Sequence, residues 1–261
     1  MSIPASHRII PLLLFPMLLA ACGVQPSDPV KAGQKWFLVP VMAEAREALR
    51  STAEVRVDSE QEIVLSPATG SPRTGLILYP GASVDPRAYA PAARALAQRG
   101  HRVILASMPF GFSLFNGNAA DDIIRRHPEI TAWAIGGHSL GGVAAASYAA
   151  EHSEKLKGLV FWASYPASGT DLKSSGLKVV SIWGTRDGRS KPEAVRDSAR
   201  WLPTDTRFVS LEGGNHAQFG WYGAQAGDLE ATLSREEQQR QIVEATAALL
   251  EAIAPSAATG P

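Results

Sequence analysis

The stretch Gly137-His138-Ser139-Leu140-Gly141 lies between an apolar run, Thr131 to Ile135, and an alanine-rich segment, Gly142 to Ala150. Glycines on both sides of a serine let a strand and a helix approach closely around a tight turn. In the order strand, G-x-S-x-G, helix, the motif predicts a nucleophile elbow that lifts the serine hydroxyl to the top of a sheet. Ser139 is therefore the candidate nucleophile.

Composition limits the class of protein. The chain has 261 residues, a length that fits one large domain with a sizeable core. Lys and Arg total 25, as do Asp and Glu, so the formal net charge is zero. Without a basic surplus we expect no nucleic-acid partner, and the expected partner is a small molecule.

The N-terminal segment is typical of an exported protein. Arg8 precedes an apolar stretch, Ile9 to Ala21, that is too short to span a bilayer as a helix. Its end, Leu19-Ala20-Ala21-Cys22, resembles the lipobox of bacterial lipoproteins, in which the cysteine accepts diacylglycerol. That resemblance implies lipidation at Cys22 and a lipid-anchored protein of the cell envelope. The alternative is an ordinary secretory signal with Cys22 incidental; as the only cysteine, Cys22 cannot form a disulfide within the chain.

Strands and helices alternate through the rest of the chain. We expect a signal peptide over residues 1–21, a tether over 22–35, one domain over 36–254 and a flexible tail over 255–261. A short helix over 36–50 and a hairpin of two strands come first. Alternating units then predict an α/β fold with a mostly parallel central sheet, helices on both faces and no large lid domain. The expected strands are 75–79, 102–106, 131–135, 159–163, 178–183 and 207–211, and the longer expected helices are 86–99, with Asp85 as N-cap, 192–201 and 235–253.

A serine nucleophile needs a base and an acid that orients the base. Asp187 is the best candidate acid, because Gly184-Thr185-Arg186-Asp187-Gly188 follows the buried-type strand Val179 to Trp183. The alternative is that Asp187 only shapes a turn beside Gly188. Asp171 and Asp205 are weaker candidates, because one follows the preceding strand and the other precedes a strand.

His216 is the candidate base, because it ends the glycine-containing loop Glu212-Gly213-Gly214-Asn215-His216 after the strand Phe208 to Leu211. The other histidines fit less well: His7 in the signal, His101 at the wrong edge of the sheet, His127 and His152 at helix ends, and His138 inside the elbow, pointing away from the nucleophile.

An oxyanion hole needs backbone N–H donors. One should be the N–H of Leu140, the residue after the nucleophile. The other should come from Tyr79-Pro80-Gly81-Ala82-Ser83. Pro80 has no N–H, so Ala82 is the first candidate and Gly81 the second.

These segments together resemble the α/β-hydrolase superfamily, and within it the small bacterial group called α/β-hydrolase fold-5. The resemblance extends from Thr74 to the final helix and includes Gly214-Asn215-His216-Ala217-Gln218-Phe219-Gly220. It implies a serine hydrolase of the esterase or lipase type that acts on a small-molecule ester or related acyl compound and uses no cofactor. One departure is Tyr79-Pro80-Gly81, which stands where His-Gly is common. The residues alone leave open an acyltransferase, a peptidase or an inactive binding lipoprotein. No cluster at metal-ligand spacing supports a metal or redox enzyme.

Two aromatic loops are expected at the same edge of the sheet. They are Pro109 to Phe115 and Phe219-Gly220-Trp221-Tyr222. They either wall an apolar acyl pocket or cover the core without touching a substrate.

Overall fold

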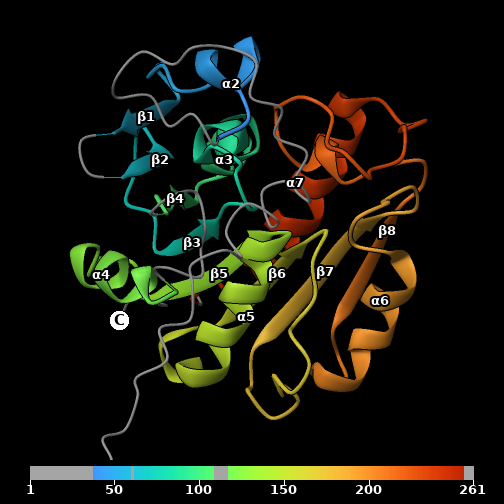
Figure 1. The fold of residues 1–261 in the computed structure, drawn as a ribbon. Helices are drawn as coiled ribbons and strands as arrows, with labels where there is room; N and C mark the ends of the chain where they lie inside the picture. Colours follow the sequence, from blue (N-terminus) through green and yellow to red (C-terminus); the bar gives the residue numbers. More distant parts are fainter. Residues whose placement is uncertain (1–37, 60–61, 109–116, 256–261) are drawn as a thin grey trace, which may run out of the picture.

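The fold is built on one eight-stranded sheet with strand order β1-β2-β4-β3-β5-β6-β7-β8 (Figure 1). A computed structural model describes residues 38–59, 62–108 and 117–255. The first two strands and β4 pair antiparallel, and every pairing from β4 through β3 to β8 is parallel. The strands are β1 (Val55–Asp58), β2 (Ile63–Pro67), β3 (Thr74–Tyr79), β4 (Arg102–Leu105), β5 (Ala132–His138), β6 (Gly158–Trp162), β7 (Lys178–Gly184) and β8 (Arg207–Leu211).

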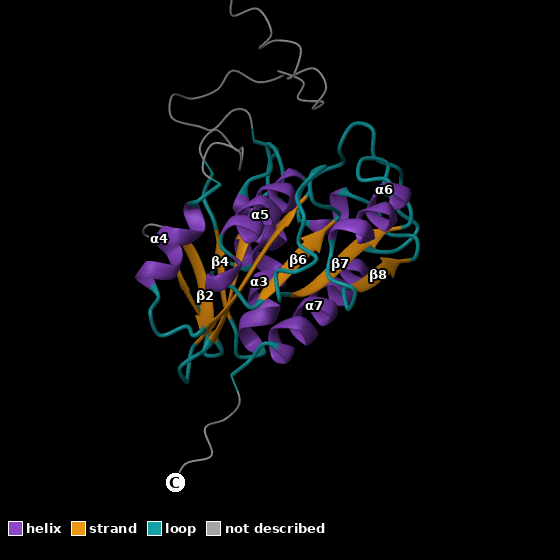
Figure 2. Ribbon diagram, turned by 90° about the horizontal axis from the view of Figure 1, so that it is seen from below, coloured by secondary structure: helices purple, strands orange, loops and turns teal. Residues whose placement is uncertain are grey.

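Helices cover both faces of the sheet, and Figure 2 shows the sheet between α5 and α7. The α-helices are α2 (Ala43–Glu47), α3 (Ala90–Gln98), α4 (Ala119–Arg126), α5 (Leu140–Glu151), α6 (Pro192–Asp197) and α7 (Arg235–Ala252), and shorter 3-10 turns include η1 (Pro86–Tyr89), η5 (Ser198–Trp201) and η6 (Ala217–Phe219). The mostly parallel α/β architecture predicted from the sequence is confirmed.

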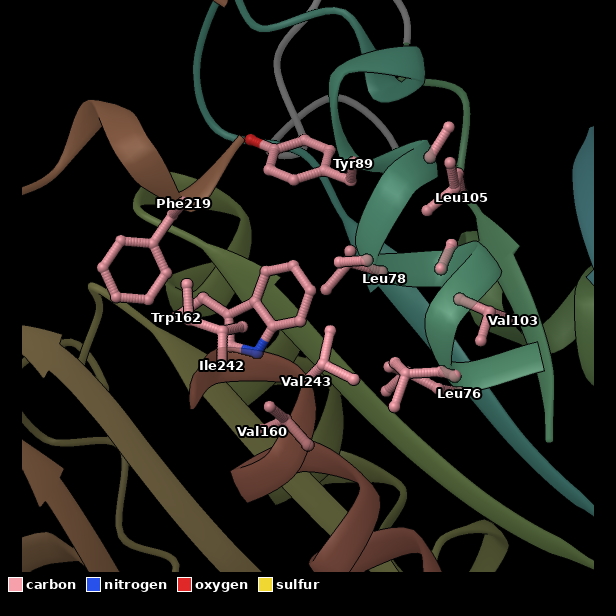
Figure 3. Packing of buried hydrophobic residues seen from close by; sticks show 14 of the residues in the cluster. Leu76, Leu78, Tyr89, Val103, Leu105, Val160, Trp162, Phe219, Ile242 and Val243 are labelled. Atoms are coloured by element: carbon pink, nitrogen blue, oxygen red, sulfur yellow. The ribbon is translucent and has the colours of Figure 1, made fainter. Parts of the chain in front are cut away.

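The period of two along the central strands divides the core into two clusters. In β3, Leu76 and Leu78 pack with the cluster against α3 and α7, whereas Ile77 and Tyr79 pack with the cluster against α4 and α5. Successive side chains of a strand point to opposite faces, so a strand covered on both sides is apolar throughout. Figure 3 shows the first cluster, in which the rings of Tyr89 and Trp162 lie 6.2 Å apart, centroid to centroid.

Two helices differ from their predicted extents. The helix expected over 36–50 is confined to Ala43–Glu47, because Val39 and Val41 form extended bridges with Val84 and Tyr222. The helix expected over 86–99 is divided at Ala90 into η1 and α3. Pro91 has no N–H to donate to the carbonyl of Arg87, so the first turn is a 3-10 turn. Asp85 caps that turn as predicted, accepting from the N–H of Arg87 at 3.0 Å.

The described N-terminal residues lie at the carboxyl edge of the sheet. The N–H of Val39 donates to the carbonyl of Ser83 at 2.8 Å, and the N–H of Met42 donates to that of Trp221 at 2.9 Å. The predicted signal peptide (1–21) and the predicted tether (22–35), which begins with Cys22, lie outside the described residues. Among the helices that the structure describes, none is both long enough and apolar enough to cross a membrane.

Candidate active site

Ser139 occupies a strained turn between β5 and α5. Its φ of 53° and ψ of −125° lie far from the regions that residues with side chains prefer. Such strain persists only where the surroundings fix it, and it concentrates at functional sites. The N–H of Ser139 donates to the carbonyl of Trp162 at 3.0 Å, and the Ser164 hydroxyl donates to the carbonyl of Ser139 at 2.6 Å. The turn is therefore fixed by Trp162 in the adjacent strand β6 and by Ser164 just after that strand.

The glycines of the motif allow the close approach that the sequence predicts. A Cβ on Gly137 would lie 2.3 Å from the carbonyl carbon of Gly141, and one on Gly141 would lie 2.3 Å from the carbonyl oxygen of Tyr79. No side chain fits at either distance, so the elbow requires glycine at both positions. These contacts and the backbone of Ser139 confirm the predicted elbow geometry.

Asp187 and His216 form a buried hydrogen-bonded pair at the ends of β7 and β8. His216 Nδ1 donates to Asp187 Oδ2 at 2.8 Å, and the two residues are 0% and 2% exposed. The other carboxylate oxygen, Oδ1, accepts from the backbone N–H groups of Arg189 at 2.8 Å and Ser190 at 2.7 Å. Asp187 thus has a specific acceptor role toward His216 beyond shaping its own turn.

The second ring nitrogen of His216 is buried without a partner. With Nδ1 donating to Asp187, the Nε2 of a neutral imidazole is an acceptor. Nε2 forms no hydrogen bond with any of the residues that the structure describes. The ring lies 4.5 Å, centroid to centroid, from that of His138, which directly precedes Ser139. A buried unsatisfied acceptor beside the elbow is available to take a proton there.

His138 is a packing and hydrogen-bonding residue of the elbow. Its ring stacks on Phe219 with centroids 5.7 Å apart, and its Nδ1 lies 2.9 Å from the Tyr89 hydroxyl oxygen. Burial, and then the nearby His216 and Arg189, lower the pKa of His138 well below its usual range. It therefore stays neutral when His216 takes up a proton.

Tyr89 joins the elbow to the loop after β3. The N–H of Gly81 donates to the Tyr89 hydroxyl at 3.0 Å, so that hydroxyl has its own proton free to donate to His138 Nδ1. Burial raises the pKa of Tyr89, which keeps it a neutral phenol. The Tyr89 hydroxyl thus connects Gly81, in the predicted oxyanion loop, to His138 in the elbow.

That bond favours one of the two candidates for the second oxyanion donor. Gly81 uses its N–H on Tyr89. The N–H of Ala82 bonds to no described residue, and Ala82 is partly exposed. Leu140 opens α5, so its N–H lies at the positive end of the helix. Leu140 and Ala82 therefore remain the candidate pair.

The alternative candidates for the acid and the base have other partners. Asp171 and Asp205 are surface carboxylates that pair with Lys173 and Lys178. His127 lies between Glu62 and Arg102. Among the described parts of the chain, no group of three or more His, Cys, Asp and Glu side chains could hold a metal ion.

The structure describes only one of the two predicted aromatic loops, the one that contains Phe219. Phe219 and Tyr222 are fully buried in the core cluster against α3 and α7. Trp221 lies beside Arg235, whose guanidinium carbon is 5.8 Å from the ring centroid, and lines a groove of about 470 Å³ between α3 and α7. Phe219 and Tyr222 thus cover the core, one of the two alternatives, whereas Trp221 lines this groove. The first loop, from Pro109, lies outside the described residues.

Three supporting residues were not predicted: Tyr89, Ser164 and Asp228. Tyr89 lies in the segment used for the family resemblance, but its bond to His138 spans 49 positions. Asp228 accepts backbone N–H groups from the loops of both Asp187 and His216. It lies in a loop without hydrophobic periodicity, and no sequence signal marks it.

Comparison with known proteins places this geometry in a family. The sequence profile of the Alpha/beta hydrolase family matches residues 75–240. No curated protein matches the chain. Three solved structures share its fold at low identity. An esterase from Thermogutta terrifontis is 16% identical with a TM-score of 0.57, covering 80% of this chain and 95% of its own. A dienelactone hydrolase from Anabaena variabilis is 16% identical with a TM-score of 0.54, covering 79% and 99%. A CIB-like hydrolase from Thermoplasma acidophilum is 18% identical with a TM-score of 0.53, covering 75% and 99%. The chain therefore belongs to the alpha/beta hydrolase family.

Proposed function

We propose that the protein is a serine hydrolase that cleaves carboxylic esters through Ser139, His216 and Asp187. The observation that carries the proposal is the buried 2.8 Å hydrogen bond between His216 Nδ1 and Asp187 Oδ2. It leaves His216 Nε2 without a partner among the described residues, next to His138 of the elbow that holds the strained Ser139. That orientation gives the imidazole the tautomer in which Nε2 can accept a proton. An esterase among the structures of similar fold supports the same class of reaction.

The reaction proceeds in two transfers. The Ser139 hydroxyl gives its proton to His216 Nε2 as Oγ bonds to the ester carbonyl carbon, and Asp187 stabilises the imidazolium. The N–H groups of Leu140 and Ala82 receive the carbonyl oxygen as it becomes negative, and each such donor contributes about 2.7–4 kcal/mol. The imidazolium then protonates the departing alkoxide, which leaves an acyl-enzyme. Water gives a proton to His216 as it attacks that acyl group, and the imidazolium then returns a proton to Ser139 Oγ as the bond to the acyl carbon breaks and the acid leaves.

Hydrolysis of p-nitrophenyl acetate separates this proposal from an acyltransferase and from an inactive binding protein. The full-length protein should release p-nitrophenol and acetate in equal amounts. Acetate released in smaller amounts than p-nitrophenol, with an acyl acceptor present, would indicate an acyltransferase. Release no faster than in buffer, across a series of acyl lengths, would indicate an inactive binding protein.

We further propose that a lipid on Cys22 anchors the protein in the cell envelope. The support is the sequence Leu19-Ala20-Ala21-Cys22 after an apolar stretch. In the sequence, Cys22 lies sixteen positions before Leu38, the first described residue. Because the described chain begins at the carboxyl edge of the sheet, we expect the anchor to hold that edge near the membrane, where lipid esters lie.

Metabolic labelling tests the anchor. In bacteria grown with radioactive palmitate, the wild-type protein should carry label and sediment with membranes, and Cys22→Ser should do neither. A wild-type protein that is cleaved but unlabelled would show that the segment is an ordinary secretory signal.

A further inference from the structure

Asp228 gathers backbone N–H groups from both loops that carry the proposed acid and base. Its Oδ1 accepts from Gly188 at 3.1 Å, from His216 at 3.3 Å and from its neighbour Leu229 at 3.0 Å. Its Oδ2 accepts from Ala217 at 2.9 Å. One partly buried carboxylate is thus bonded to the residue after Asp187 and to the main chain of His216 itself.

The segment around Asp228 fits closely between these loops. A Cβ on Gly188 would lie 2.3 Å from the carbonyl oxygen of Gly227 and 3.1 Å from the Cα of Asp228, so the two main chains are in direct contact. The side-chain amide of Asn215 donates to the carbonyl of Leu229 at 2.7 Å. Asp228 is therefore held in place by contacts of its neighbours with each loop, independently of its own bonds.

The acid and base follow different strands, β7 and β8, and one side-chain hydrogen bond joins them. Their loops also meet where the N–H of Arg186 donates to the carbonyl of Gly214 at 2.8 Å and the N–H of Gly213 donates to the Thr185 hydroxyl at 2.9 Å. These contacts precede Asp187 and His216 in the chain, whereas Asp228 bonds at and after them. The position of the His216 ring relative to Ser139 depends on the main chain of residues 216 and 217, to which Asp228 bonds. A carboxylate suits this role because it has two acceptor oxygens and no donor, and hydrogen bonds to charged groups are the stronger class.

We infer that Asp228 is a positioning residue that fixes His216 relative to Asp187 and Ser139 by clamping the two loops at their backbones. This role rests on the proposed Ser139-His216-Asp187 function. Asp228 acts through His216 and does not touch the reacting atoms.

Asp228→Asn tests the clamp with little change in shape. The amide keeps one oxygen, so either the three donors on Oδ1 or the donor Ala217 must face an NH₂ group that cannot accept. We expect kcat for p-nitrophenyl acetate to fall about 10- to 100-fold, the scale of a misplacement near 1 Å, with KM within about twofold of wild type. Asp171→Asn is the matched control. Asp171 also accepts a backbone N–H, from Lys173 at 3.0 Å, but lies on the surface; its kcat should not change.

The proton of His216 Nδ1 gives a second readout that needs no substrate. In the wild type, its bond to Asp187 should give a ¹H NMR signal far downfield, identified by its absence in His216→Gln. In Asp228→Asn the signal should shift or broaden, and in Asp228→Glu, which restores both acceptor oxygens, it should recover in part together with kcat. If Asp228→Asn does not fold, kcat and the proton signal are measured in Asp228→Glu and compared with those of wild type.

The outcomes separate the clamp from the proposed function. An unchanged proton signal and unchanged kcat in Asp228→Asn overturn the clamp. So does a lower thermal midpoint with an unaltered signal, since that result describes a structural role alone. A wild type that hydrolyses no ester, yet whose proton signal moves in Asp228→Asn, contradicts the proposed function and leaves the clamp standing.

Discussion

Replacing Ser139 by alanine is expected to lower kcat for ester hydrolysis on the order of 10⁶-fold while the protein stays folded. The loss is this large because the acyl-enzyme cannot form. Alanine keeps the backbone contacts of the elbow, including the N–H donated to Trp162 and the carbonyl that accepts from Ser164. We therefore expect the circular dichroism spectrum and the urea midpoint to match those of wild type.

Ser147→Ala is the matched control for that variant. Ser147 lies on α5, the helix that follows Ser139, and its hydroxyl donates to the carbonyl of Val143 at 3.2 Å. Its loss should leave kcat unchanged. A Ser139→Ala protein that retains a tenth or more of the wild-type kcat would show that another group is the nucleophile.

Asp187→Asn is expected to lower kcat about 10⁴-fold. The amide oxygen is fixed by the environment: the N–H groups of Arg189 and Ser190 donate to the position of Oδ1 and favour oxygen there. The NH₂ group then faces His216 Nδ1, which must become an acceptor. The imidazole proton moves to Nε2, so His216 can no longer accept a proton from Ser139.

The kinetics of combined variants check this explanation. Because the three residues act as a unit, Ser139→Ala with Asp187→Asn should be no slower than Ser139→Ala alone. Asp205→Asn, on the surface beside Lys178, should behave as wild type. If Asp187→Asn kept a kcat within tenfold of wild type, or if the two effects multiplied, Asp187 would have a structural role only.

Much of the fold could be predicted because burial on both faces makes each central strand a short apolar run. Strands β3 to β8 begin and end within a few residues of the predicted ranges. The same regularity located Asp187 and His216. Parallel strands end at one edge, so loops after β7 and β8 must approach the turn after β5, and the structure brings the two side chains to 2.8 Å.

What could not be predicted depends on contacts between distant segments. The bridge of Val41 to Tyr222 displaced the start of the first helix. The bond between Tyr89 and His138 joins residues 49 positions apart, and three bonds of Asp228 join its loop to Gly188, His216 and Ala217. The division of the helix at Ala90 has a different cause: the missing N–H of Pro91 is a local signal that the sequence carries.

The measurement that tests the central claim most directly is peptide mapping after reaction with a fluorophosphonate probe. A serine activated by an adjacent base attacks phosphorus and keeps the phosphonyl group, whereas ordinary serines do not react. We predict one adduct per molecule, on the peptide containing Ser139, absent in Ser139→Ala and strongly slowed in Asp187→Asn. An adduct on another residue, or labelling that persists in Ser139→Ala, would contradict the assignment of Ser139 as the nucleophile.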